Sequence, residues 1–204
     1  WRALTCPLNI RDITIINDTV YFATGGGLLI KTGDQFTTFT TIDGLNGVDI
    51  SVIAADGNGY VWLGGSTPNG FVQIYDPNKK SSVGLFDYGL TEITGFWIGD
   101  SLALAAFIQG QDVGLMKWVF VDGEWSYRDI FRNFPVNIGN INGFGVHDST
   151  IFLGSENGLW MGEKELEDLI YYILFISPIF IVILLNSTLY NGWRHLFFVY
   201  PCFL

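Results

Sequence analysis

The hydrophobic and polar positions of the first 163 residues follow one plan that occurs four times. Each copy has an apolar run led by isoleucine, a short polar turn, a second apolar run, and a third run that opens with glycine. The paired runs before the glycine are residues 13–24, 50–65, 93–107 and 141–155. Short apolar runs separated by turns of Asn, Asp and Gly are typical of antiparallel strands joined as hairpins.

The glycines that open the third runs give the length of the repeat. They are Gly27, Gly70, Gly114 and Gly158, at intervals of 43, 44 and 44 residues. A fourth run closes the first three copies, and a tandem four-stranded unit of ~40–45 residues is typical of a propeller blade. We therefore predict an all-β fold over residues 1–163, a partial β-propeller of about three and a half four-stranded blades.

The first two repeats carry short motifs that match a known repeat family. Residues 39–45 read Phe-Thr-Thr-Ile-Asp-Gly-Leu, residues 52–59 read Val-Ile-Ala-Ala-Asp-Gly-Asn-Gly, and residues 61–64 read Val-Trp-Leu-Gly. A related stretch, Ile-Phe-Leu-Gly-Ser-Glu-Asn-Gly-Leu, occupies residues 151–159. Over about residues 10–163 the chain resembles two-component regulator propeller proteins. This resemblance implies a periplasmic or surface-exposed bacterial propeller, as in sensor ectodomains and in secretion and surface-attachment machinery.

The composition changes sharply after Glu163. Of the 25 glycines 24 precede it, and residues 169–193 form a run of 25 without Asp, Glu, Lys or Arg. A helix needs about 20 apolar residues to cross a bilayer. We therefore predict a second region, residues 164–204, with a transmembrane helix at about residues 167–187 and the start of another apolar segment. The alternative is a helix buried in a protein core.

The end of the chain resembles a second family. Residues 189–201 read Leu-Tyr-Asn-Gly-Trp-Arg-His-Leu-Phe-Phe-Val-Tyr-Pro. This stretch is similar to a segment of polytopic membrane glycosyltransferases that use a lipid-linked sugar, which makes Trp193, Arg194 and His195 a candidate tail motif. Nothing in this chain matches the catalytic acidic residues of that family. The three residues are also typical of an aromatic and cationic anchor at the membrane surface.

Charge and cysteine content narrow the function classes. The formal net charge of −10 argues against nucleic-acid binding, because no basic stripe is available to neutralise phosphates. Two cysteines at opposite ends, Cys6 and Cys202, form neither a disulfide framework nor a zinc-site spacing. The sequence begins with Trp1 and not with Met, so we expect a fragment of a longer protein.

Candidate sites in the repeats are few. Four tryptophans within strand runs could form a ligand platform for carbohydrate or peptide, and packing between blades is the alternative; they are Trp62, Trp97, Trp118 and Trp160. Residues 56–59, Asp-Gly-Asn-Gly, resemble part of a calcium loop but lack its remaining ligands, so a hairpin turn is favoured. The sequence predicts no catalytic residues, no cofactor and no metal ligands.

The propeller repeats cover about four-fifths of the chain and the glycosyltransferase-like tail about one-fifth, by the ranges above. The sequence therefore favours a non-enzymatic binding or scaffold module of a bacterial sensor or surface and secretion system. We expect a membrane location, with the tail in contact with lipid and the propeller periplasmic or extracellular. The expected partner of the propeller is an unidentified protein, peptide or carbohydrate. The alternative is a fragment of a membrane glycosyltransferase with a lipid-linked sugar donor, which leaves enzymatic activity an open question.

Overall fold

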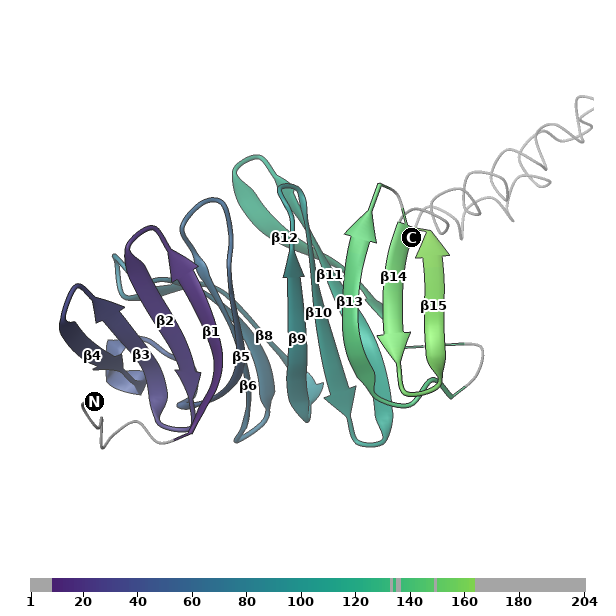
Figure 1. Ribbon diagram of the computed structural model, residues 1–204, viewed down its shortest axis with the longest axis horizontal. Helices are drawn as coiled ribbons and strands as arrows, with labels where there is room; N and C mark the ends of the chain where they lie inside the picture. The colour runs from purple at the N-terminus through teal and green to yellow at the C-terminus, as the bar shows by residue number, and fades with distance from the viewer. Residues whose placement is uncertain (1–8, 133, 135–136, 149, 164–204) are drawn as a thin grey trace, which may run out of the picture. The chain divides into compact units, whose positions relative to one another are not determined.

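The computed structural model describes residues 9–132, 134, 137–148 and 150–163. In this part of the chain the strands form four antiparallel sheets, and in each sheet the strands are neighbours in sequence order (Figure 1). The first three sheets have four strands and the last has three. We call them blades 1 to 4. The all-β fold and the fourfold repeat predicted from the sequence are confirmed for these residues.

Each blade is a meander in which every strand turns back beside the one before it. The strands are β1 (Ile10–Ile16), β2 (Thr19–Thr24), β3 (Gly27–Thr32) and β4 (Gln35–Phe39) in blade 1; β5 (Asp49–Ala55), β6 (Val61–Thr67), β7 (Gly70–Asp76) and β8 (Ser81–Leu90) in blade 2; β9 (Glu92–Ile98), β10 (Leu102–Gln109), β11 (Asp112–Val121) and β12 (Glu124–Phe131) in blade 3; and β13 (Ile141–His147), β14 (Thr150–Ser155) and β15 (Gly158–Glu163) in blade 4. A short 3-10 turn, η1 (Thr41–Asp43), connects blades 1 and 2.

Turn chemistry fixes the hairpins. Asn17 between β1 and β2 has φ 52°, and Asp122 and Gly123 between β11 and β12 have φ 53° and 86°. Two-residue hairpin turns that match the twist of the strands need this left-handed conformation, which Asn, Asp and Gly adopt at low cost. The turn residues recognised in the sequence therefore set where each strand ends.

The cores lie between consecutive blades, because each strand of a blade alternates its side chains between two neighbours. On β6, Val61 and Leu63 belong to the core shared with blade 1, whereas Trp62 belongs to the core shared with blade 3. In β2 of blade 1, Tyr21 and Ala23 face the same core as Val61 and Leu63. Burial on both faces explains why β6 and β7 read as nearly continuous apolar runs.

The packing described below concerns one compact unit, whose described residues are 9–132, 134, 137–145 and 153–160. A second unit contains the end of β13, the beginning of β14 and the end of β15. The predicted membrane helix at residues 167–187 and the segment after it lie outside the described residues. Among the residues that are described, no helix is long and apolar enough to cross a membrane.

Candidate functional site: the inner strands

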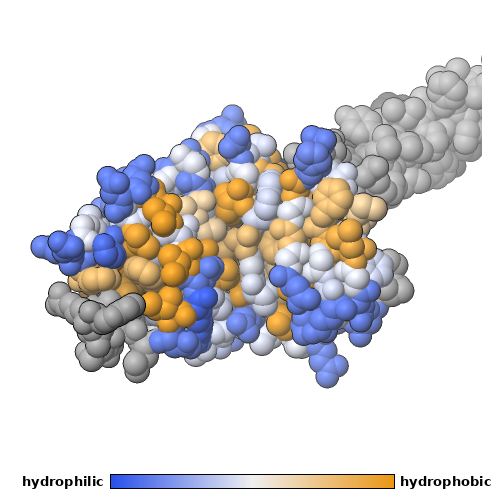
Figure 2. Space-filling view, viewed as in Figure 1, coloured by the Kyte–Doolittle hydropathy of each residue, from blue (hydrophilic) through white to orange (hydrophobic). Residues whose placement is uncertain are grey.

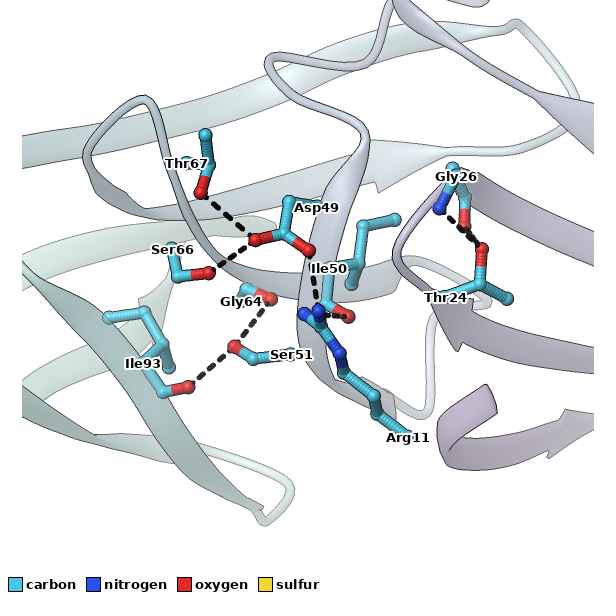
Figure 3. A network of polar contacts seen from close by, with 11 residues as sticks. Arg11, Thr24, Gly26, Asp49, Ile50, Ser51, Gly64, Ser66, Thr67 and Ile93 are labelled. Atoms are coloured by element: carbon cyan, nitrogen blue, oxygen red, sulfur yellow. Dashed lines mark hydrogen bonds and ion pairs between the residues drawn. The ribbon is translucent and has the colours of Figure 1, made fainter. Parts of the chain in front are cut away.

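We call the first strand of each blade, β1, β5, β9 and β13, its inner strand. Polar side chains link β1 to β5 and β5 to β9. The guanidinium of Arg11 on β1 lies 2.7 Å from a carboxylate oxygen of Asp49 on β5 and also donates to the carbonyl oxygen of Ile50 (Figure 3). One residue further along β1, Asp12 accepts a hydrogen bond of 2.9 Å from the backbone N–H of Ile53. These contacts hold β1 beside β5 without a shared backbone ladder.

Asp49 is the most densely bonded carboxylate of this network. Besides Arg11, it accepts hydrogen bonds from the hydroxyls of Ser66, at 2.7 Å, and Thr67, at 3.0 Å, both on β6 (Figure 3). The hydrogen bond from Ser66 is the largest cause that lowers the pKa of Asp49, with smaller effects from Thr67 and from the charge of Arg11, while burial opposes them. Asp49 therefore stays ionised well into the acidic range.

A serine makes the corresponding link between blades 2 and 3. The hydroxyl of Ser51 on β5 lies 2.7 Å from the carbonyl oxygen of Ile93 on β9 and 3.1 Å from that of Gly64 on β6 (Figure 3). Since β5 is thereby tied to both of its neighbours, the inner strands of blades 1 to 3 form a continuous polar-linked surface.

This surface contains a hollow of about 280 Å³ that is open to solvent. Its lining comes from the middle of the four first strands, β1, β5, β9 and β13, all within the compact unit defined above; the residues are Asp12, Val52, Ile53, Thr94, Gly95, Phe96, Ile141, Asn142, Gly143 and Phe144. Thr94 and Asn142 are exposed, and Phe96 and Phe144 are half-buried. The ring of Phe96 packs edge-to-face on Trp62, with centroids 6.0 Å apart, so the hydrogen-bonding groups of the hollow come from Thr94 and Asn142.

Of the residues that line the hollow, Asp12 carries the charge. Asp12 uses both carboxylate oxygens on backbone N–H groups, those of Ile13 and Ile53. Within the described residues, no group of three or more His, Cys, Asp or Glu side chains is placed to hold a metal ion. Thr94 and Asn142 add neutral hydrogen-bond donors and acceptors to the lining of the hollow.

The candidate tryptophans separate into two kinds. Trp62 and Trp118 are fully buried, with ring centroids 5.4 Å apart and edge-to-face, in the core between blades 2 and 3. Trp97 and Trp160 are only half-buried, and Trp160 donates from its indole N–H to the hydroxyl of Ser155 at 3.0 Å. The structure thus brings Trp62 and Trp118 together and closes them from solvent, and the platform hypothesis stays a prediction for Trp97 and Trp160.

The Asp56 segment is the hairpin turn that the sequence favoured. One carboxylate oxygen of Asp56 accepts from the backbone N–H groups of Asn58 and Tyr60, which closes the turn between β5 and β6. The other oxygen accepts from the indole N–H of Trp125, at 2.8 Å, and more weakly from that of Trp62. Because Trp125 lies on β12, this carboxylate also ties blade 2 to blade 3.

The Asp43–Gly44–Leu45 motif forms a loop that side chains of β7 anchor. The amide of Gln73, buried on β7, donates to the carbonyl oxygen of Gly44 and accepts from the N–H of Asn46, both at 2.9 Å. The hydroxyl of Tyr75 donates to the carbonyl oxygen of Asp43 at 2.6 Å. Burial, assisted by the charges of Asp43 and Asp76, raises the pKa of Tyr75 to about 12, so the tyrosine keeps this proton at physiological pH.

Sequence reasoning missed the inner-strand residues and did not single out Arg11, Asp12, Asp49, Thr94 or Asn142. The available signal was weak: in all four repeats the residues on either side of the leading isoleucine are polar, which is also the ordinary pattern of a strand with one solvated face. The candidate tail residues Trp193, Arg194 and His195 lie outside the described part of the chain.

The fold defines a class, a repeat of four-stranded antiparallel blades. Neither a protein-family model nor a curated protein matches the chain. Among solved structures, the chain is similar to the computationally designed Ika4 protein, with 12% identity and a TM-score of 0.59 over 79% of this chain and 95% of that one.

Two natural bacterial proteins have the same fold. One is the extracellular domain of the putative hybrid two component system BT4673 from B. thetaiotaomicron, with 16% identity and a TM-score of 0.57 over 77% of this chain. The other is PorZ, a surface component of the type-IX secretion system of Porphyromonas gingivalis, with 17% identity and a TM-score of 0.50 over 76% of this chain. The chain spans only 22% and 24% of the length of these two proteins. At such identities the likeness concerns the fold.

Proposed function

We propose that this chain is an extracytoplasmic binding or scaffold module of a bacterial sensor or surface and secretion system, and that its ligand binds at the hollow of the inner strands. The observation that carries the proposal is the convergence of Thr94, Asn142, Phe96 and Phe144, from two blades, on one open hollow. The fold shared with an extracellular sensor domain and with a secretion component supports the proposed location.

The geometry favours a ligand held by hydrogen bonds and aromatic contact. Peptides and carbohydrates both offer neutral amide or hydroxyl groups at the spacing of adjacent strands, and both stack apolar faces on aromatic rings. Rigid strands give such a site a fixed shape, because each of the four inner strands is held within its blade by hydrogen bonds. A binding site on rigid elements loses little entropy when the ligand binds.

The test is a binding screen of the full chain on arrays of bacterial glycans and of peptides. The double variant Thr94→Ala/Asn142→Ala should lose at least tenfold in affinity for any array hit, which corresponds to about 1.4 kcal/mol. The matched control is Asn58→Ala, an exposed amide in the β5–β6 turn whose backbone N–H, and not its side chain, makes a hydrogen bond within the described residues. Equal loss in both variants, or none in the double variant, would place the ligand elsewhere.

We also propose that the apolar run of residues 169–193 tethers the module to the membrane. The support is its length of 25 residues without a charged side chain. In inside-out and right-side-out vesicles, protease should digest residues 10–163 from one side only and leave a protected fragment that contains the run. Complete digestion from one side, tail included, would contradict the tether while leaving the binding proposal intact.

A further inference from the structure

A second hollow lies between blades 1 and 2, on the strands that follow the inner ones. It has a volume of about 500 Å³, is open to solvent and lies wholly within the compact unit defined above. Its floor is made of β2, β3 and β4 of blade 1, and its wall is the β7–β8 turn of blade 2, with Pro77, Asn78 and Lys80. We call it the outer hollow. Its size is in the range of ligand pockets, ~300–1,000 Å³.

The next pair of blades shows why the outer hollow is open. Between blades 1 and 2, the rings of Phe39 on β4 and Tyr75 on β7 meet edge-to-face, with centroids 6.3 Å apart. Between blades 2 and 3, the rings of Phe86 on β8 and Trp118 on β11 meet in the same way, at 5.2 Å. Each pair joins the fourth strand of one blade to the third strand of the next. The two interfaces can therefore be compared position by position from these rings.

Beyond this pair, the hairpin of blade 3 fills its interface with aromatic rings. Phe120, two residues after Trp118, pairs across the hairpin with Trp125. The indole of Trp125 packs edge-to-face on that of Trp62 in blade 2, with ring centroids 5.3 Å apart. Trp62 holds on β6 the place that Tyr21 holds on β2, since each faces the core shared with the blade that follows.

In blade 2 the equivalent positions hold a proline and a lysine. The β7–β8 ladder ends two residue pairs earlier than the β11–β12 ladder, at Asp76 and Ser81. The next two positions are Pro77 and Lys80, which stand where blade 3 has its two aromatic rings. The space that the indole of Trp125 fills between blades 2 and 3 is therefore open between blades 1 and 2, and it forms part of the outer hollow.

Hydroxyl groups line the floor of the outer hollow. The register places Thr19 beside Thr32, with their hydroxyl oxygens 3.4 Å apart. On the same face of the sheet, Tyr21 and Thr37 lie on either side of Ile30. Burial raises the pKa of Tyr21, so its hydroxyl keeps its proton, and each of these hydroxyls can both donate and accept. On the side of the molecule seen in Figure 2, by contrast, apolar residues gather over β1 and β2.

The cations beside the outer hollow are paired. The ammonium of Lys80 lies 3.4 Å from a carboxylate oxygen of Asp43 and 4.5 Å from the ring centroid of Phe39. Lys79 pairs with Asp76 in the same turn, at 3.3 Å. Because each lysine of the wall has its own carboxylate, the site favours a ligand without net charge.

We propose that the outer hollow binds a ring of a neutral saccharide. A sugar ring offers hydroxyls to the threonines and to Tyr21, and an apolar face to Ile30 and Pro77. A peptide strand gains less, because β2 and β3 already pair with strands on both sides and leave no free ladder for it to join. This proposal does not rest on the ligand of the inner strands, since the two hollows are lined by different residues.

The test is saturation-transfer NMR of the full chain in a detergent without a sugar headgroup. The probes are glucose, galactose, mannose, N-acetylglucosamine and their disaccharides, and at least one should receive saturation and titrate to a defined Kd. Lys80→Trp should abolish this binding, because it restores a ring like the one that fills the space between blades 2 and 3. Lys79→Trp is the matched control and should bind like the wild type, since the Lys79 side chain is 76% exposed and does not line the hollow.

A milder variant tests the hydroxyls. Thr37→Val should weaken binding about fivefold, the effect of losing one hydrogen bond. Thr38→Val is its control, because Thr38 is exposed on the opposite face of β4. Binding that survives Lys80→Trp but is lost in Thr94→Ala/Asn142→Ala would overturn this proposal and support the inner-strand site. Binding of none of these sugars, or of the peptide Gly-Trp-Gly in their place, would also overturn it.

Discussion

At the scale of single residues, buried carboxylates act as connectors in this protein. Asp56 illustrates this, because its two oxygens accept four hydrogen bonds from the β5–β6 turn and from two indole rings. The position was recognisable in the sequence as a turn, since Asp-Gly-Asn-Gly is turn chemistry. Its contact with Trp125 was not, because 69 residues separate the two in the chain.

We expect Asp56→Ala to lower the free energy of unfolding by about 2–3 kcal/mol, because buried N–H donors lose their acceptor. Chemical denaturation followed by tryptophan fluorescence measures this change. Asp18→Ala is the control: Asp18 is exposed in the equivalent turn of blade 1 and should change stability by less than about 0.5 kcal/mol. Similar losses in both variants would mean that the turn, and not the link to blade 3, is responsible.

Asp49 should give the stability an acid dependence. Its pKa is lowered in the folded protein from the ordinary value of 3.8, so it stabilises the fold when ionised, and this contribution is lost as the pH falls through and below that value. We expect Asp49→Asn to cost about 1 kcal/mol at pH 7 and progressively less below pH 4. Denaturation curves of the wild type and of Asp49→Asn from pH 7 to pH 3 measure this difference in the free energy of unfolding. A difference that stays the same at every pH would contradict the role of ionised Asp49.

At the scale of strands and blades, the regular spacing of glycine carried most of the predictable information. It gave the length of the repeat, whereas the apolar runs and the turn residues between them predicted the hairpins and the fourth strand of the first three blades, because turn and strand preferences are local. The inner-strand links were not predictable in the same way. Arg11 and Asp49, or Ser51 and Ile93, meet only after two blades have packed, and a single sequence contains no signal for such pairing.

One strand position is fixed by how closely two blades approach. A Cβ atom on Gly64 of β6 would lie 2.5 Å from a methyl carbon of Val52 and 2.7 Å from the Cβ of Ile93. We expect Gly64→Ala to destabilise the protein by about 1–3 kcal/mol through overpacking. The control is Gly57→Ala, where an added Cβ meets nothing within 4 Å. Thermal melting compares the stability of the two variants. Equal melting temperatures would show that blade 3 can move away at no cost.

At the scale of the whole molecule, the cores between blades make each blade depend on its neighbours. Stability in such repeats is the sum of unit and nearest-neighbour terms, so damage at one interface spreads to the two blades that share it. We expect Gly64→Ala to increase hydrogen exchange in β5–β8 and β9–β12 together, and less in β3 and β4. Mass spectrometry of peptic fragments measures this pattern. A change confined to β6 would show that the blades open independently.

The anchoring of the loop around Gly44 has a consequence for how such chains are shortened, lengthened or recombined. Gln73 and Tyr75 of blade 2 hold the loop that leads out of blade 1, so this loop belongs structurally to the blade that follows it. A crossover placed there would separate the loop from its anchors. The exposed turn at Gly33 and Asp34, between β3 and β4, makes no such long-range bond in the described structure. Duplication or circular permutation of the repeat should therefore succeed more often when the chain is cut inside a blade, at the β3–β4 turn, than when it is cut in the loop around Gly44 between two blades.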